Sequence, residues 1–338
     1  RFRSEFYQPL HWNMRWFAEP AVEYSKGTQD LWAGGQAITQ FQFTRARAQL
    51  SAGRGLGRWG ELRATAFTSQ NRGAPRIGDP SFESGSERLG GGELSFRVDT
   101  EDSIVFPSTG ANVNLLYAKS VDAFGSEYDF ERWWGGASYA WSFGKITIVP
   151  YVEYGENLED IQSFFSLYDL GGLFRLSGLG TRELLGDRMA LARVIAYRRL
   201  FKFQMAGINV RLYAGASFEA GNAFFILDTP MTWDNAIKAG SVFVGADTFL
   251  GPAILAYGFA GIEETQRAGA EKVLREIDGG AARDIARGDE GEAIGFCQVC
   301  SMVQADHGDE RRGGRLVVVG DLQAVVGVVA DNQRFWWW

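Results

Sequence analysis

A strict two-residue alternation of side-chain polarity limits what this chain can fold into. From Ile208 to Glu219 every even-numbered residue is apolar, and every odd-numbered residue is polar, Gly or Tyr. Only a β-strand with one apolar and one polar face gives this period over so long a run. Residues 241–247 repeat the pattern, with Asp247 on the polar face. We therefore expect Glu219 and Asp247 to point toward the same polar space.

The composition favours one large membrane β-barrel over several soluble domains. The chain has 338 residues, of which 43 are Gly, 8 are Pro and 14% are aromatic. It has no run of about 18 apolar residues, so it offers no transmembrane helix. A barrel of the sixteen-stranded type would account for this length. A soluble β-sandwich also alternates, but many runs here span about ten residues, whereas soluble strands typically span about five or six.

Alternation and turn residues divide the chain into about thirteen strands before residue 260. We place them at 3–7, 13–24, 36–50, 62–66, 94–98, 112–117, 128–142, 145–154, 170–176, 188–200, 208–219, 241–252 and 253–259. A change of parity predicts a β-bulge near Thr44, and Gly-rich or acidic stretches predict loops at 71–92 and 155–161. An odd strand number leaves unpaired edges in lipid, so we expect that this chain lacks strands and inserts into bilayers only when they are supplied.

Three properties of the sequence change together near residue 260. From Gly261 onward there are 14 acidic and 9 basic residues, and both cysteines, Cys297 and Cys300, lie in this part. All 11 tyrosines precede it, the last being Tyr257. We therefore expect an incomplete barrel domain at 1–260 and an anomalous tail at 261–338.

The tail has two interpretations. It could be a small α/β appendage, with a helix at 262–287 and strands at 316–319 and 324–330. It could also be the product of a shifted reading frame that replaced the closing strand. We favour the frame shift, because a charged, helix-like run stands where a barrel needs a strand.

Four segments in the second half of the barrel region carry a family resemblance. They are LFRLSG at 173–178, AYRR at 196–199, YAGASFEAGN at 213–222 and GADTFLGP at 245–252. In this order they resemble the C-terminal half of the bacterial surface antigen superfamily of outer-membrane assembly and secretion barrels. The nearest type is the barrel of patatin-type autotransporters, which segments 5–10, 59–63 and 99–110 also resemble. The resemblance covers roughly residues 1 to 260. In the family a returning loop joins strands eleven and twelve, and here it joins our ninth and tenth segments, so the resemblance implies that the first two strands and the last one are missing.

The resemblance implies a loop that returns into the barrel and ties itself to the inner wall. Its motif residues here are Arg175, Leu176, Ser177, Gly178 and Leu179. In the family an Arg of this loop, which joins strands eleven and twelve, reaches acidic residues on strands thirteen and fourteen. Here Ser177 stands at the position of that Arg, while Glu219 and Asp247 match the acidic partners.

Two nearby arginines could replace the missing cation. Arg175 lies two residues before Ser177 and so keeps the same facing in an extended chain, with Arg182 behind it. We therefore expect Arg175 to bridge Glu219 and Asp247, because a buried carboxylate pair without a cation is costly. This arrangement is either a lock needed for barrel assembly or gating, or a static salt bridge in the lumen.

The sequence gives little support for catalysis, so we expect this chain not to be an enzyme. It has no Gly-x-Ser-x-Gly nucleophile elbow, and its two histidines, His11 and His307, are far apart. Asp278-Gly279-Gly280 matches part of a patatin dyad, but the family places that dyad before the barrel. The pair Cys297 and Cys300 lacks a second ligand pair for zinc. We expect no cofactor and no metal.

Two function classes remain. In the first, the chain is an outer-membrane translocator or insertion barrel that anchors and secretes an upstream patatin-like domain. In the second, it is only the anchor of an outer-membrane patatin-like phospholipase whose catalytic domain lies outside this chain. The implied partners are outer-membrane lipid, an upstream passenger or secreted polypeptide, the barrel assembly machinery and, as a further option, a second copy of the chain. The net charge of −7 argues against nucleic acid.

Overall fold

A computed structural model describes residues 1–12, 15–33, 36–78, 84–159, 164–205, 208–224, 232–248, 251–261 and 313–318. Nearly all of this part of the chain is antiparallel β-sheet. Its helical turns are the 3₁₀ turns η1 (Asp122–Phe124) and η2 (Phe164–Ser166). Neither these nor any other helix among the described residues is long and apolar enough to cross a membrane.

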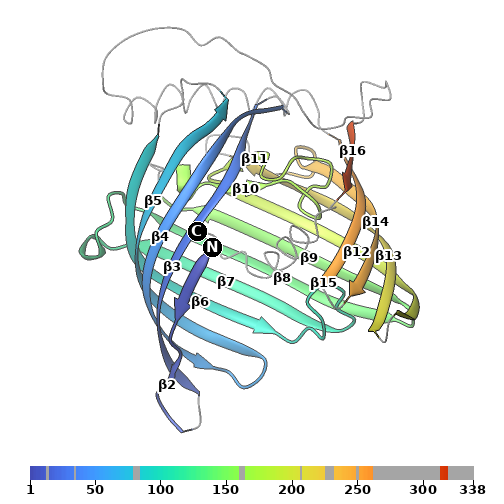
Figure 1. Ribbon diagram of the computed structural model, residues 1–338, viewed down its shortest axis with the longest axis horizontal. Coiled ribbons are helices and arrows are strands. Elements are labelled where there is room, and N and C mark those ends of the chain that lie inside the picture. Colours follow the sequence, from blue (N-terminus) through green and yellow to red (C-terminus); the bar gives the residue numbers. More distant parts are fainter. Residues whose placement is uncertain are drawn as a thin grey trace.

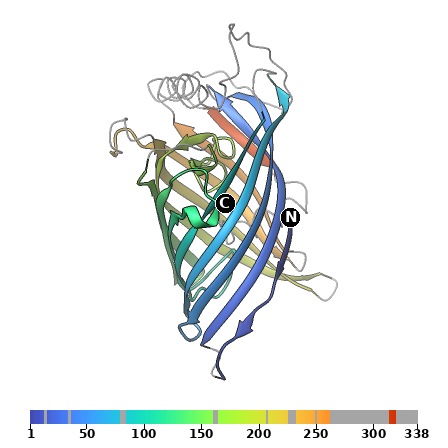
Figure 2. The same ribbon diagram turned by 90° about the vertical axis from the view of Figure 1, so that its left-hand side faces the viewer.

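One curved sheet contains the long strands, and each strand pairs antiparallel with the next in the order (Figure 1). In this order they are β1 (Phe2–Glu5), β3 (Trp16–Ala33), β4 (Gln36–Gly55), β5 (Gly60–Gly78), β6 (Gly85–Asp99), β7 (Gly110–Ser120), β8 (Glu131–Phe143), β9 (Ile146–Asn157), β12 (Arg188–Met205), β13 (Ile208–Phe224), β14 (Ile237–Thr248), β15 (Gly251–Gly261) and β16 (Gly313–Val318). The short β2 (Gln8–Pro9) pairs with β3. A single sheet that curves round a central axis is the barrel architecture expected from the alternation, not the two stacked sheets of a sandwich (Figure 2).

The two faces of the sheet have opposite character. On β13, Glu219 is fully buried, whereas its neighbour Phe218 is 52% exposed. The exposed large apolar side chains lie on the same outward parity of many strands: Val22, Leu50, Leu62, Leu94, Val152, Val194, Phe218, Val242, Val244 and Leu255. An apolar outer band with polar groups inside is the pattern of a transmembrane barrel. The predicted facing of Glu219 is thereby confirmed.

Several strands continue through stretches that we expected to be loops. The loop prediction at 71–92 is wrong, because β5 runs to Gly78 and β6 begins at Gly85. The register pairs Asn71 with Glu87, and the Asn71 amide donates to the Glu87 carboxylate over 3.2 Å. Polar residues and glycines persist in these strands because the ladder is formed by backbone groups, which any residue except Pro supplies.

The predicted bulge near Thr44 is also wrong. Pairing of β4 with both neighbours is continuous around Thr44, and the register shifts lie between Leu31 and Trp32 and between Gln40 and Phe41. The parity change in the sequence has another cause. Phe43 lies on the inner face, where its ring meets that of Phe165 edge-on with 5.4 Å between the centroids.

Segment 170–176 is not a barrel strand. Only β10 (Tyr168–Leu170) is extended there, and it pairs with β11 (Leu184–Gly186) in a separate small sheet. The expected strand alignment counted this segment, so it is wrong by one strand. The residues between Asn157 and Arg188 therefore form a long connection between β9 and β12, the eighth and ninth strands of the large sheet.

Part of the expected tail contributes to the sheet. β16 pairs antiparallel with β15, from Ala260 opposite Gly313 to Leu255 opposite Val318. The predicted strand at 316–319 overlaps β16. The predicted helix at 262–287 and the strand at 324–330 lie outside the described residues, and the division at residue 260 stays a prediction.

Candidate functional site

The segment between β9 and β12 folds back against the inner face of the sheet. It contains η2, the β10–β11 pair and the turn at 171–183, and the small sheet lies inside the ring of strands (Figure 1). Leu170 and Leu176 are fully buried. They pack with Met189 and Leu191 of β12 and with Ile237 of β14 in one apolar cluster. We call residues 168–186 the returning segment.

The tip of the returning segment is held in an unusual backbone conformation. Phe174 and Leu176 have φ values of 64° and 74°, which are unfavourable for residues with a Cβ atom. Gly178 has φ 99°, and a Cβ added there would lie 2.5 Å from the backbone of Phe259 on β15. Such a conformation persists only where surrounding contacts determine it, so the tip is shaped by the wall it touches.

Ser177, at the tip of the returning segment, binds Glu219, a fully buried carboxylate on β13. The backbone N–H of Ser177 donates to Glu219 Oε2 over 2.5 Å, and its hydroxyl donates to Oε1 over 2.7 Å. Ser217 Oγ donates to the same Oε1 and also lies 2.7 Å from Ser241 Oγ. Both Ser177 and Glu219 are 0% exposed. Hydrogen bonds from Ser177 and Ser217 thus satisfy both oxygens of the buried Glu219 carboxylate.

Arg175 has different partners from those expected. Its Nη2 donates to Glu153 Oε1 over 3.1 Å and to the carbonyl of Asp169 over 3.2 Å, and its Nη1 lies 3.7 Å from Asp169 Oδ1. Burial disfavours its charge, but the carboxylates of Glu153 and Asp169 raise the pKa of Arg175 above its ordinary value. Arg182 donates to Asp169 Oδ2 over 2.5 Å from a more exposed position. The Glu153 carboxylate also accepts the indole N–H of Trp134 over 2.9 Å.

The expected contact of Arg175 with Glu219 and Asp247 is therefore wrong. Asp247 pairs in register with Arg211, whereas Glu219 lies opposite Ala239. Eight residues of strand separate Ala239 from Asp247, which is about 26 Å at the usual rise. Asp247 instead makes a half-exposed ion pair of 3.6 Å with Arg211. Parity fixes the face of a side chain, but only register fixes its height along the wall.

Arg193 on β12 is a site residue that we did not single out from the sequence. Its Nη1 donates to the carbonyl of Phe174 over 2.7 Å, and its guanidinium lies 4.4 Å from the centre of the Tyr151 ring. It therefore holds the tip of the returning segment by a main-chain contact. The sequence signal was its place on the polar face of β12, opposite Glu219 in the register.

A second loop enters the barrel from the opposite end. The residues between β6 and β7, 100–109, place Phe106 against Tyr213, with 4.2 Å between stacked ring centroids, and edge-on to Tyr197. A Cβ added at Gly245 would lie 2.3 Å from the Phe106 ring. The Tyr197 hydroxyl also donates to the carbonyl of Pro107.

The two inward loops share one apolar cluster on the inner wall. Phe174 of the returning segment meets Phe243 edge-on at 5.2 Å, and Phe106 of the 100–109 loop lies over Gly245, two residues along the same strand. The cluster also contains Tyr197, Tyr213 and Ala256. The inner face of β12–β15 is thus covered from both ends.

The returning segment also reaches both flanks of the sheet. Gly178 contacts β15 as described above, and a Cβ added at Gly180 would lie 2.3 Å from the Trp32 ring on β3. β3 and β15 are each next to the last strand at their end of the strand order. One segment therefore bridges the two ends of the sheet across the lumen.

Comparisons with known proteins identify the architecture. The sequence matches no family model and no curated protein. Among solved structures, the chain is similar to BamA from Haemophilus ducreyi lacking POTRA domains 1–3, with a TM-score of 0.55 and 10% identity over 76% of this chain and 57% of that chain. It is also similar to CdiB from Escherichia coli, with a TM-score of 0.51 and 11% identity over 73% of this chain and 46% of that chain. This chain has the fold of a bacterial outer-membrane β-barrel. It spans about half the length of these two structures.

The described part of this outer-membrane barrel contains no group of three or more His, Cys, Asp or Glu side chains that could hold a metal ion. The residues weighed for catalysis or zinc binding in the tail, Asp278, Cys297, Cys300 and His307, lie outside the described residues. Among the described residues the site is a set of contacts between the inward loops and the inner wall.

Proposed function

We propose that this chain is the translocator or insertion barrel of a surface-antigen protein in the bacterial outer membrane, and that it anchors an upstream patatin-like domain. The observation that carries the proposal is the returning segment, which is tied to β13 through Ser177 and touches both β3 and β15. A plain diffusion pore needs no segment across its lumen. A barrel that passes or inserts polypeptide needs its strands held together and its lumen closed at rest.

The contacts of the tip suit a plug that docks and releases. Glu219 binds it through an N–H and a hydroxyl of Ser177, and Arg193 binds the carbonyl of Phe174. Water could replace each of these hydrogen bonds when the segment moves, at a modest net cost of about 0.5–3 kcal/mol per bond. The partners of this function are the passenger or secreted polypeptide, the barrel assembly machinery and outer-membrane lipid.

The second candidate is a static anchor for a patatin-like phospholipase whose catalytic domain lies outside this chain. The 100–109 loop carries the resemblance to that type, and its Phe106 packs on the same wall as Phe174. In this case the two inward loops only fill the lumen. A second copy of the chain as a partner stays a prediction.

A reporter exchange separates the two functions. An unrelated unfolded reporter is fused before Arg1, in the place of the proposed upstream domain, and its exposure to external protease is measured on whole cells. A translocator delivers the reporter to the cell surface, whereas a static anchor leaves it in the periplasm. Retention of the reporter inside, with a folded barrel shown by heat-modifiable migration on a gel, would overturn the translocator proposal.

Conductance in planar bilayers adds a test of the plug. We expect Glu219→Gln to open more often than the wild-type protein, because the amide NH₂ cannot accept the Ser177 N–H. Asp247→Asn is the matched control, since Asp247 lies on the same polar parity but makes its ion pair with Arg211, away from the tip. Equal conductance of both variants and the wild type would contradict a mobile plug.

A further inference from the structure

The outward face of β3–β6 changes from apolar to basic along the strands. One row of the register joins Val22, Ala48 and Thr68, and the rows below it carry exposed apolar residues such as Leu50 and Leu94. The next row up joins Tyr24, Ala46, Gln70 and Arg88, and the row above joins Lys26, Thr44, Arg72 and Ser86. An exposed Tyr at the edge of an apolar band marks the level of lipid headgroups.

The basic residues of these two rows are close together. Arg72 and Arg88 are diagonal neighbours on adjacent strands, a separation of about 7 to 8 Å. Lys26 lies in the row of Arg72, two strands away, or about 10 Å. All three side chains are exposed, and none forms an ion pair with a residue that the structure describes.

The carboxylates nearest to these rows leave the cations available. Glu23 and Glu87 have the inward parity of their strands, and Glu23 pairs with Arg1. Glu127 accepts the backbone N–H of Arg88 over 2.9 Å, so it contacts the main chain of β6. Long side chains on this outward face can therefore converge on an external anion.

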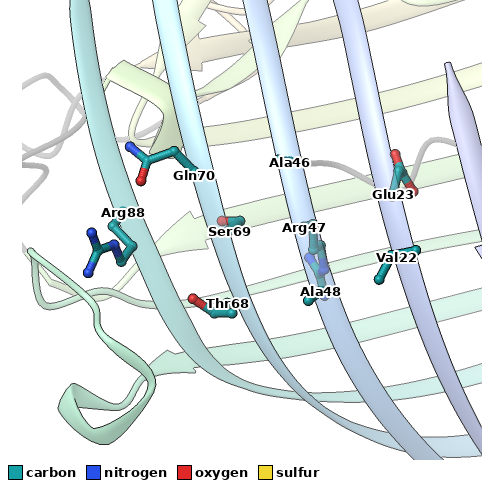
Figure 3. A pocket seen from close by; sticks show the side chains of 9 residues that line it. All are labelled: Val22, Glu23, Ala46, Arg47, Ala48, Thr68, Ser69, Gln70 and Arg88. Carbon is teal, nitrogen blue, oxygen red and sulfur yellow. The ribbon is translucent and has the colours of Figure 1, made fainter.

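An open groove of about 360 Å³ extends from the row of Ala46, Gln70 and Arg88 to the row of Val22, Ala48 and Thr68. Figure 3 shows its lining, with the small side chains of Ala46, Ala48 and Thr68 between those of Val22 and Arg88. Small residues in neighbouring strands leave a depression because the flanking side chains stand higher. Glu23, Arg47 and Ser69 also line it but have the inward parity of their strands, so the groove opens on the outward face, over Ala46 and Ala48 and beside Arg88.

We propose that this surface binds a phosphorylated anionic lipid. Its phosphate lies between Arg72 and Arg88, with Lys26 as a third cation, and one acyl chain lies in the groove over Ala46 and Ala48. Guanidinium groups bind phosphate by paired hydrogen bonds, which an ammonium cannot match in geometry. The cations lie at the headgroup level and the groove lies beside them, so one lipid molecule can place its phosphate and an acyl chain at the same time. Free phosphate has no acyl chain, and a neutral lipid has no net charge for the cations to bind.

The site belongs to the leaflet at the barrel end that carries the returning segment. β3 and β5 run toward this end, and β9 ends and β12 begins there. At the opposite end Gly144 and Lys145 alone connect β8 to β9. Outer-membrane barrels have their short turns in the periplasm and longer loops outside, so the proposed lipid is one of the outer leaflet.

Lipid binding by the purified full-length protein tests the proposal. The protein in detergent is titrated with phosphatidic acid, with phosphatidylcholine of the same acyl chains and with inorganic phosphate, and bound lipid is counted by native mass spectrometry. We expect phosphatidic acid to bind in preference to phosphatidylcholine. Arg72→Gln with Arg88→Gln should weaken it about 25-fold, since each cation near an anionic lipid is worth about a factor of five.

The matched control removes two exposed outward arginines elsewhere, Arg54→Gln with Arg198→Gln. It should leave phosphatidic acid binding unchanged. Ala46→Trp, which fills the groove, should lower the affinity for the lipid without changing any charge. If the double Gln variant does not show heat-modifiable migration, Arg72→Lys with Arg88→Lys replaces it, with an expected loss of about fivefold from the missing paired hydrogen bonds.

Three outcomes would overturn the proposal. Equal weakening by both double variants would show non-specific attraction to the whole surface. Competition by inorganic phosphate at the same concentration as the lipid would show a free-phosphate site. Full binding by Ala46→Trp would show that no acyl chain lies in the groove.

Discussion

On the inner face of β3–β6, which we call the charged wall, charged side chains pair with one another. On the inner face of β12–β15, which we call the plug wall, apolar side chains and a single buried Glu contact the inward loops. In the first, the charged wall, Arg63 lies 2.8 Å from Glu19, and Arg47 lies 2.7 Å from Glu93. In the second, the plug wall, Glu219 is bound by Ser177 and Ser217. The two walls differ because the inward loops cover the plug wall.

A wall covered by protein loses water, and an unpaired charge there is costly. The plug wall therefore carries Met189 and Leu191 on β12 and Phe243 on β14 at inner-facing positions, where they interrupt the alternation of these two strands, whereas β13 keeps its alternation. On the charged wall the inner-facing positions hold Arg47, Arg63, Glu19 and Glu93, because these charges pair across the inner face. On β12 and β14 the breaks in alternation thus coincide with the positions where the inward loops pack.

Removal of Glu219 should have the largest effect on this contrast. Glu219→Ala leaves the Ser177 N–H and hydroxyl and the Ser217 hydroxyl without their shared acceptor. Because hydrogen bonds to charged groups contribute about 1.5–3 kcal/mol each, we expect the free energy of unfolding to fall by about 4 to 5 kcal/mol. Urea titration read by heat-modifiable migration measures it.

The matched change on the charged wall is Glu19→Ala, which should lower the free energy of unfolding by less, about 2 to 3 kcal/mol, because its donors Arg3 and Arg63 are partly exposed and keep other carboxylates. Its partner Arg63 keeps Glu61 at 2.7 Å. Equal losses for Glu219→Ala and Glu19→Ala would show that the two walls do not differ in the way described.

Phe106→Ala should have the second largest effect. The ring is 6% exposed and packs on Tyr213, Tyr197 and Gly245. Truncation of a buried Phe leaves a cavity, so we expect the free energy of unfolding to fall by about 3 to 4 kcal/mol. We also expect protease to cleave the 100–109 loop faster.

Phe143→Ala is the control for this change, because Phe143 is 53% exposed at the same end of the barrel and on the outer face. It should leave cleavage of the 100–109 loop unchanged. Cleavage equal to that of Phe106→Ala would mean that the 100–109 loop is not held by the plug wall.

Arg175→Ala should lower the free energy of unfolding by a smaller amount, about 2 to 3 kcal/mol. Asp169 keeps Arg182, and Glu153 keeps the indole N–H of Trp134. We expect Arg182→Ala to cost less still, since its side chain is 39% exposed, compared with 10% for Arg175. The amount of folded barrel in membranes measures both.

Arg175→Lys should recover only part of the loss, because one ammonium cannot reach Glu153 and the Asp169 carbonyl in the same geometry. If Arg182→Ala assembles worse than Arg175→Ala, the more exposed arginine holds the returning segment instead.

Glu101→Gln should have the smallest effect, and it depends on pH. Burial raises the pKa of Glu101 above its ordinary 4.5, the hydrogen bond from Ser138 lowers it, and the charges of Asp99 and Asp102 raise it. A raised pKa means that the stabilising protonated form is fully present below pH 4.5 and is lost as the pH rises through the folded-state pKa.

Glu101→Gln mimics the protonated form at every pH. We expect the variant and the wild type to have the same urea midpoint at pH 4, and the variant to have the higher midpoint at pH 7. A variant less stable than the wild type at pH 7 would show that the ionised carboxylate stabilises the loop.

The sequence alone determined the position of most barrel strands and which face of β13 is polar. Glu219 was placed on the inner face because a strand repeats every two residues, and that period can be read without knowing any neighbour. The returning segment was found through its motif, and its residue Ser177 does contact Glu219. The sequence also indicated a barrel, since strands this long with one apolar face suit a bilayer.

Only the tertiary structure decided which side chains meet. Asp247 shares the parity of Glu219 but not its height, because the β13–β14 register pairs it with Arg211. Arg175 turns to Glu153 and Asp169, because the chain at Phe174 and Leu176 adopts positive φ and so abandons the extended facing that parity assumes. The strand register and the path of a loop depend on contacts between residues far apart in the sequence, so they cannot be predicted from a two-residue period.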